Sequence, residues 1–447
     1  MWATIALISH ELLLFAACGF LLFGVDDLVV DLHWLRHLMR RQGLPTPNSV
    51  RLRKEQPHTL VAVFVPAWRE AEVIGAMIDR CNRAWGTGSF CIFVGTYRND
   101  PATQAEITQR LGDKVIMVVL DRDGPTTKAD CLNGLWHAMA ALEAENRKHF
   151  GAVLLHDAED HVHADEILLF GELTGQFGLV QIPVVPVPDP HSHWIAGHYA
   201  DEFAESHIKE LVVRQLVGAS LPSAGTGCAV SRAALERIAE TRGGKPFDAD
   251  SLTEDYELGL HIGQLGLKSH FVRQTALGGR GLITVRSCFP NTFDAAVRQK
   301  TRWIIGIALA GWDRTGWRGG FAEHWMRWRD RRVILAALLI VSAYGGGMMA
   351  SLLWVVGRTK PPDPLMSTLL TASLSLFLWR TMMRSVCSAH QYGWKQGLLS
   401  VPRVAISNGV SVAASFMAVV GYIRILWTGE VRWAKTEHQF PSQLDVS

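Results

Sequence analysis

Apolar residues gather into long runs near both ends of the chain, and the central part shows a different pattern. Residues 4–25 are apolar over a length that can span a bilayer, and they lack the basic start and cleavage site of a signal peptide. A second apolar run covers residues 333–356, and a shorter one covers 365–379. The pattern predicts a retained transmembrane anchor over residues 1–30 and two further transmembrane helices within 333–387.

The apolar stretch at residues 400–427 permits two interpretations. It is long enough to span a membrane, yet Arg403 and three serines recur at four-residue spacing on one face of a helix. Basic residues flank both ends of the stretch. This combination favours an amphipathic helix lying in the membrane interface, with a fourth transmembrane helix as the alternative. We expect residues 388–447 to contain this helix and a cytoplasmic tail.

Short runs rich in β-branched residues alternate with longer amphipathic segments between the apolar ends. Four runs are predicted to be strands, at residues 60–65, 91–97, 115–120 and 152–156. A helical pattern follows each run, so residues 60–290 are expected to form a doubly wound, Rossmann-like α/β domain. Ligands bind beyond the carboxyl ends of the strands in such sheets. The acidic residues predicted at these ends are Glu70, Asp100, Asp123 and Asp157.

Composition and charge narrow the class of protein. Of the 447 residues, 48% are hydrophobic and 19% are charged, which suits a large globular domain joined to membrane segments. The net charge of +2 says little by itself, but the sequence has no long basic run of the kind that suggests nucleic acid as a partner. The 7 cysteines include no Cys-x-x-Cys pair, which is typical of a reduced domain that faces the cytosol.

Basic residues also lie beside the apolar runs. Arg36, Arg40 and Arg41 follow the first run, and arginines between residues 327 and 332 precede the second. The positive-inside rule therefore places residues 31–332 in the cytoplasm, with residues 31–59 as a linker.

Carboxylates cluster at the end of the fourth predicted strand, in the sequence His156-Asp157-Ala158-Glu159-Asp160. Strand alternation would put Asp157 and Glu159 on the same side, and hard oxygen ligands of this kind suit Mg²⁺ or Mn²⁺. One alternative is an acidic loop that caps the next helix. The other is a zinc site that includes the neighbouring histidines, which lack a further ligand to complete a tetrahedral set.

Two predicted helix starts carry polar side chains that suit a binding site. Lys128 lies in the first turn of one helix, where free backbone N–H groups and a lysine both favour a phosphate. Thr253-Glu254-Asp255 forms the predicted N-cap and first turn of another helix, and its acids could supply a general base. The alternative for each is an ordinary helix start, with a solvated lysine or with acids favoured by the helix dipole.

The sequence Gln299-Lys300-Thr301-Arg302-Trp303 lies on a predicted helix within residues 291–332. Gln299, Arg302 and Trp303 fall on adjoining faces of that helix. An arginine can stabilise a leaving diphosphate, and a tryptophan offers a flat apolar surface to a sugar ring. The alternative is a simple anchor helix at the membrane interface, which also uses Arg and Trp.

In this order, the motifs resemble those of membrane-bound family 2 glycosyltransferases of the cellulose and hyaluronan synthase type. The resemblance implies a GT-A fold inserted between transmembrane helices, with Asp255 as the base and Trp303 under the acceptor sugar. It implies that Asp157 and Glu159, or Asp160 as the second ligand, face the metal. Further residues have implied roles: Glu254, Gln299 and Arg302 in catalysis, Glu70, Asp100, Lys128 and Asp157 in nucleotide-sugar binding, and Gly225, Thr226, Gly227 and Cys228 at the acceptor.

Other segments, including Asp201-Glu202-Phe203-Ala204-Glu205, resemble the inner-membrane phage-adsorption protein B group more closely. This resemblance implies a multi-pass protein of the bacterial inner membrane with a cytoplasmic catalytic domain. It implies an inverting, metal-dependent transferase that uses a UDP-sugar, of the N-acetylhexosamine class, to elongate and export an exopolysaccharide. Its partners would be the growing glycan, membrane lipids and an outer-membrane export or receptor protein. The alternatives are transfer of one sugar to polyprenyl phosphate, or a non-catalytic scaffold for an envelope receptor.

Overall fold

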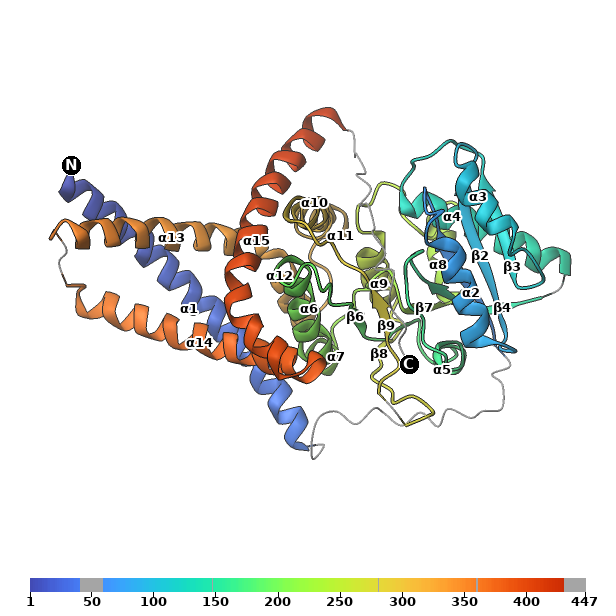
Figure 1. Ribbon diagram of the computed structural model, residues 1–447, viewed down its shortest axis with the longest axis horizontal. Coiled ribbons are helices and arrows are strands. Elements are labelled where there is room, and N and C mark those ends of the chain that lie inside the picture. Colours follow the sequence, from blue (N-terminus) through green and yellow to red (C-terminus); the bar gives the residue numbers. More distant parts are fainter. Residues whose placement is uncertain (41–58, 147, 280, 359–360, 430–447) are drawn as a thin grey trace.

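The computed structural model describes residues 1–40, 59–146, 148–279, 281–358 and 361–429. Most of the predicted linker and the predicted tail beyond residue 429 lie outside the described residues. Figure 1 shows an α/β domain on one side, a bundle of long helices on the other, and α15 between them.

A mixed sheet of 7 strands forms the centre of the α/β domain, in the order β3-β2-β1-β4-β7-β5-β8. The four strands predicted from the sequence are confirmed, with ends that differ by at most two residues. Strand β7 runs antiparallel to both of its neighbours, whereas the other pairs in this sheet are parallel. The strands are β1 Leu60–Pro66, β2 Phe90–Tyr97, β3 Val115–Leu120, β4 Phe150–Leu155, β5 Leu179–Gln181, β7 Cys228–Ser231 and β8 Ser269–Phe271, and β6 Val184–Pro186 pairs with β9 Val285–Ser287 in a second sheet.

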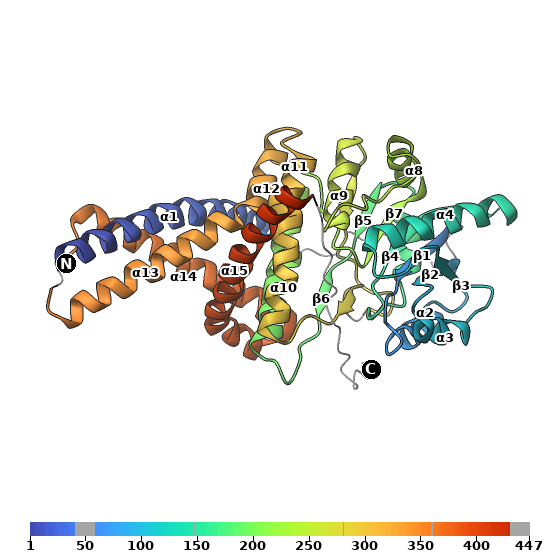
Figure 2. The same cartoon turned by 90° about the horizontal axis from the view of Figure 1, so that it is seen from above.

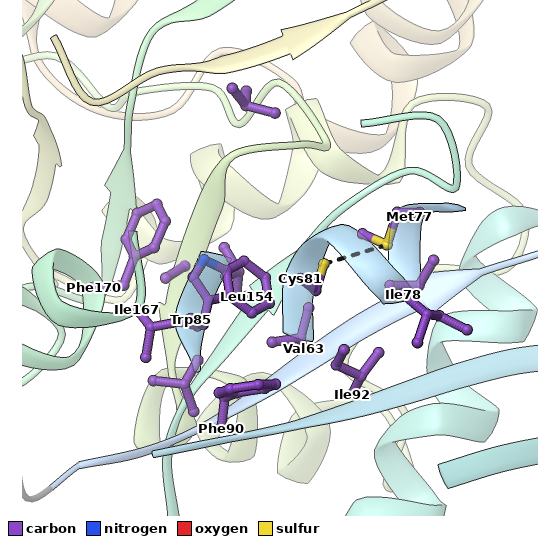
Figure 3. Packing of buried hydrophobic residues seen from close by; sticks show 14 of the residues in the cluster. Val63, Met77, Ile78, Cys81, Trp85, Phe90, Ile92, Leu154, Ile167 and Phe170 are labelled. Carbon is purple, nitrogen blue, oxygen red and sulfur yellow. Dashed lines mark hydrogen bonds between the residues drawn. The ribbon is translucent and has the colours of Figure 1, made fainter. Parts of the chain in front are cut away.

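Helices cover both faces of the large sheet because its central strands are apolar on both sides. Side chains such as Val63 and Ile92 pack against α2, α3 and α5, as Figure 3 shows for α2 and α5. The alternate residues, such as Phe64 and Phe93, pack against α4, α8 and α9. The helices of the domain and of the segment after it are α2 Ile74–Trp85, α3 Pro101–Thr108, α4 Lys128–Asn146, α5 Glu166–Leu173, α6 Ile195–Glu205, α7 Leu211–Leu216, α8 Arg232–Thr241, α9 Glu254–Gln264, α10 Phe293–Ile304, α11 Ala310–Thr315 and α12 Phe321–Arg331, with π-helical turns η1 Ser206–Glu210 and η2 Ile305–Leu309.

Three long helices run side by side away from the domain: α1 Trp2–Arg40, α13 Val333–Val355 and α14 Pro364–Tyr392 (Figures 1 and 2). Small residues let them approach closely, because a Cβ at Gly19 would overlap Leu339 and a Cβ at Gly24 would overlap Leu376. Helix α14 continues well past the predicted apolar run. Its Arg380 pairs with an aspartate of α1 at 3.2 Å.

Helix α15, Trp394–Thr428, crosses the domain end of this bundle instead of running along it (Figures 1 and 2). Among the described residues, α1, α13 and α15 are apolar enough, by length and composition, to cross a membrane, and α14 is not among them. The predicted span within α14 therefore stays a prediction. The polar stripe predicted on α15 faces the protein, since Arg403 is 2% exposed and pairs with Asp201 of α6 at 3.2 Å. Its outer face is apolar and includes Phe416 and Trp427. The choice between an interface helix and a fourth span therefore stays a prediction.

Candidate active site

A cavity of about 170 Å³ lies beyond the carboxyl ends of β1, β2 and β4, on the side of the domain that faces α10. Most of the predicted site residues line it, although they come from distant parts of the sequence. They are Glu70, Lys128, Asp157, Glu159, Thr226, Glu254, Asp255, Gln299, Arg302 and Trp303.

Aromatic and polar side chains form the wall of the cavity nearest the sheet. Trp68 follows β1 and meets Tyr97, the last residue of β2, in a T-shaped contact with 5.1 Å between ring centroids. The Tyr97 hydroxyl lies 2.8 Å from the Thr126 hydroxyl, just before α4. This wall offers a flat aromatic surface, which suits a nucleobase, and hydroxyl groups, which suit a ribose.

Lys128 opens α4, as predicted, and reaches the middle of the cavity. Its Nζ lies 2.5 Å from Oδ1 of Asp157 and 3.3 Å from the carbonyl oxygen of Gly225. Burial opposes the charged form, but the charges of Asp157, Glu254 and Asp255 outweigh it and raise the pKa of Lys128. Lys128 therefore stays a cation among the acids of the site.

The carboxylates after β4 do not follow strand alternation, because β4 ends at Leu155 and residues 156–159 form a loop. The premise of the metal-site prediction was therefore wrong, although Asp157 and Glu159 both line the cavity. Among the described residues, no three His, Cys, Asp or Glu side chains come together as a ligand set. For the zinc alternative, Nδ1 of His163 already accepts a hydrogen bond from the backbone N–H of Asp165.

Asp160 lies beneath the cavity and has no exposed surface. Its carboxylate accepts hydrogen bonds from the backbone N–H of Asp157 and from the hydroxyls of Thr226 and Ser287. His156 lies 3.0 Å from the same carboxylate. Asp160 thus joins three walls of the cavity through its bonds to Asp157, Thr226 and Ser287. The choice between Glu159 and Asp160 as the second ligand of a metal stays a prediction.

Glu254 and Asp255 begin α9, and Thr253 is its N-cap residue, as predicted. Burial, followed by the charge of Asp255, raises the pKa of Glu254 to about 7. Burial also raises the pKa of Asp255, while the charge of Lys128 acts in the opposite direction. A carboxylate whose pKa lies above its usual range is a better proton acceptor near neutral pH.

Buried polar contacts fix α9 relative to the helices that follow the domain. Tyr256 donates to Asp330 of α12 at 2.7 Å, and Arg214 pairs with the same carboxylate at 2.9 Å. Glu257 accepts from Arg314 of α11 at 2.9 Å. These contacts therefore hold the two acids at the start of α9 in position relative to α11 and α12.

Gln299, Arg302 and Trp303 reach the cavity from the last turns of α10, where the helix becomes the π-helical turn η2. Oε1 of Gln299 and Nε of Arg302 are buried and have no hydrogen-bond partner among the described residues. Buried polar atoms are normally paired, so these two atoms are available to a ligand. Gly306 of η2 lies against Thr253, and a Cβ there would overlap that side chain.

Four of the predicted residues lie outside the cavity lining. Asp100 caps α3 and accepts from the backbone N–H of Arg69 at 2.6 Å, so it holds the loop that carries Glu70. Gly225, Gly227 and Cys228 lie just behind the lining, where Gly225 packs against the carboxylate of Asp255. Direct roles for these four in binding stay predictions.

The sequence reasoning missed several lining residues, including Trp68, Phe203 and Phe289. Trp68 lies three residues after the end of a predicted strand, and this position could have identified it. Phe203 lies in a segment that was noted only for its resemblance. Nothing in the local pattern around Phe289 marks it as a cavity residue.

Comparisons with known proteins identify the family. Residues 57–306, more than half of the chain, match the model described as Glycosyltransferase like family 2. The chain belongs to this family. The predictions of a family 2 glycosyltransferase, of an enzyme and of a GT-A fold class are confirmed.

Two curated proteins and one solved structure show how far the similarity extends. Bacteriophage adsorption protein B of Escherichia coli (strain K12) and bacteriophage N4 adsorption protein B of Escherichia coli O157:H7 are each 33% identical over 453 residues, which cover 94% of this glycosyltransferase and 60% of the relative. The chain therefore spans about 60% of the length of these relatives. The mannosyltransferase PcManGT from Pyrobaculum calidifontis, solved with GDP-Man and Mn²⁺, has a TM-score of 0.50 at 15% identity, over 91% of this chain and 99% of that one. This last similarity supports the fold alone.

Proposed function

We propose that this glycosyltransferase uses a UDP-sugar, of the N-acetylhexosamine class, to elongate an exopolysaccharide with inversion at the anomeric carbon. The observation that carries the proposal is the convergence of Lys128, Asp157, Asp255, Arg302 and Trp303 on one cavity. The set combines cations that could contact a diphosphate, a carboxylate that could act as the general base, and an aromatic surface for a sugar. The curated relatives add support, because they match nearly the whole chain.

The donor would lie across the wall nearest the sheet. Trp68 and Tyr97 would contact the nucleobase, and Lys128 at the start of α4 would contact the diphosphate. Arg302, with its unpaired Nε, would stabilise the charge that develops on the diphosphate as the sugar leaves. The solved mannosyltransferase holds a guanine nucleotide sugar, so GDP-mannose belongs among the donors to be tested.

A divalent metal fits this site with help from the donor. Asp157 and Glu159 line the cavity, and Mg²⁺ or Mn²⁺ is commonly held by one or two carboxylates with substrate phosphates and water. The metal, when bound, would neutralise charge on the diphosphate. Asp157 also contacts Lys128, so the lysine would help to orient this ligand.

Asp255 would act as the base. It would accept the proton of the acceptor hydroxyl while that oxygen forms a bond to the anomeric carbon and the bond to the diphosphate breaks. Attack from the side opposite the leaving group inverts the anomeric carbon. Trp303 would support the acceptor ring, and Gln299 would contact a hydroxyl through its unpaired oxygen.

We propose further that α1, α13 and α14 cross the bacterial inner membrane, with the α/β domain in the cytoplasm and α15 at the interface. The apolar outer face of α15 and its path across the bundle support this arrangement (Figure 1). Arg380 and Arg384 of α14 pair with Asp27 and Glu205, which suits the cytoplasmic border. Export of the glycan would involve a further partner or a second copy.

The test of this function is nucleotide release by the purified full chain in detergent. We expect release of UDP from one sugar among a panel of UDP-sugars and GDP-mannose, dependent on Mn²⁺ or Mg²⁺ and abolished by EDTA. Glycan products would be separated by size, since a ladder of lengths indicates elongation. Release of GDP alone would contradict the proposed donor, and a lipid-linked product with one sugar would contradict elongation.

The rate of transfer should depend on pH through Asp255, which must be deprotonated to accept a proton. Burial raises its pKa, so activity is lost as the pH falls through this raised value. Lys128 lowers the pKa of Asp255, so Lys128→Met should move the acid limb of the kcat profile to higher pH. Lys128→Arg keeps the charge and should keep the limb in place. Identical acid limbs in Lys128→Met and the wild type would contradict this assignment.

A further inference from the structure

Three aromatic side chains form a continuous surface on the wall of the cavity away from the sheet. Phe203 of α6 lies 4.6 Å from Phe289 and 6.5 Å from Trp303, measured between ring centroids, and all three line the cavity. Tyr199, which has no exposed surface, lies behind them at 5.1 Å from Phe289. The three rings in front are partly exposed, so they can contact a ligand.

The two sides of the cavity differ in chemistry. Lys128 and the carboxylates lie toward the sheet, where the nucleotide and diphosphate are proposed to bind. The surface formed by Phe203, Phe289 and Trp303 carries no charge, so it does not suit a phosphate. Aromatic rings do contact the C–H face of a sugar ring. This surface therefore suits the acceptor glycan, and it is wider than Trp303 alone provides.

An ion pair sets the spacing within this surface. Glu202 precedes Phe203 on α6, and it pairs at 2.6 Å with Lys300, which lies on the same helix as Trp303. Asp201 pairs with Arg403 of α15. Since neighbouring residues of α6 are tied to two other helices, Phe203 is held in place beside the cavity.

We propose that Phe203 and Phe289 bind the second sugar ring of the acceptor, next to the terminal ring on Trp303. The inference rests on the proposed function and names the part of the substrate that this wall recognises. Acceptors of two or more sugars would then bind better than a single sugar. Phe203 thereby contributes to the preference of the protein for longer acceptors.

The experiment compares KM values for acceptors of different length, using the purified full chain. Glycans recovered from the wild-type reaction and sorted by size serve as longer acceptors, and the corresponding monosaccharide is the internal reference. The wild type should show a lower KM for the longer acceptor. Phe203→Leu should reduce that preference about fivefold, and Phe203→Tyr should retain it.

Phe90→Leu is the matched control, because Phe90 is a buried aromatic residue at the start of β2, at the opposite end of that strand from the cavity, and does not line it. It should keep the preference for longer acceptors. If Phe203→Leu fails to fold, Phe289→Leu makes the same test. An unchanged preference in Phe203→Leu, or in Phe289→Leu where Phe203→Leu does not fold, overturns this inference and leaves the proposed function standing. A wild-type protein that transfers no sugar overturns the proposed function, and this inference with it.

Discussion

Replacing Asp255 with asparagine is expected to lower kcat for sugar transfer by about 10²–10⁴-fold, the range of a lost general base. The amide has nearly the same shape but cannot accept the proton of the acceptor hydroxyl. The effect should appear in kcat more than in the KM of the donor, because Asp255 acts on the acceptor. Nucleotide release in the presence of acceptor measures this change.

Asp250→Asn is the control for this substitution. Asp250 is an exposed carboxylate a few residues before α9, and it lies outside the cavity lining. Its replacement removes the same charge from the same region and should leave kcat unchanged. If Asp255→Asn and Asp250→Asn had equal activity, Asp255 would not be the base. A loss confined to Glu254→Gln would move the role to that residue.

The sequence predicted the strands and the starts of two helices well because these features are local. The strands are short apolar runs between polar turns, and β3 has the predicted ends. Helices α4 and α9 begin at the predicted Lys128 and Glu254, where polar residues precede an amphipathic pattern. The antiparallel direction of β7 was not predicted, because strand direction follows from the path of the chain between strands.

The role of Asp160 could not be predicted, because its partners are far away in the sequence. Thr226 and Ser287 are 66 and 127 residues from it. From the local pattern, an acid beside Asp157 and Glu159 is as suitable a ligand as they are. Only the fold shows that its oxygens are already used by hydroxyl and backbone donors.

Helix α15 is a second case in which the sequence could not show a contact, because the partner residue is distant along the chain. A polar stripe on an apolar helix predicts a face that avoids lipid, and the sequence could not distinguish water from protein as its neighbour. Arg403 contacts Asp201, which is 202 residues earlier. The stripe is therefore a contact with α6, and this contact helps to hold the helix that carries Phe203.

Gly225→Ala is expected to lower kcat by about 10²-fold, the effect of displacing a catalytic group by about 1 Å. Gly225 has a φ of +74°, and a Cβ at this position would overlap Oδ2 of Asp255. The backbone strain of about 1–2 kcal/mol would also lower the free energy of unfolding. The carboxylate would have to turn away from the cavity, so the loss should exceed what instability alone causes.

Gly218→Ala separates these two effects. Gly218 has nearly the same φ, +77°, and a Cβ there would meet no atom within 4 Å. It should therefore lower the thermal stability of the protein as much as Gly225→Ala does, while kcat stays near the wild-type value. Thermal unfolding and nucleotide release, measured on both variants, give the comparison. Equal losses of kcat would mean that Gly225 acts through stability, and would remove the evidence that its missing side chain sets the position of Asp255.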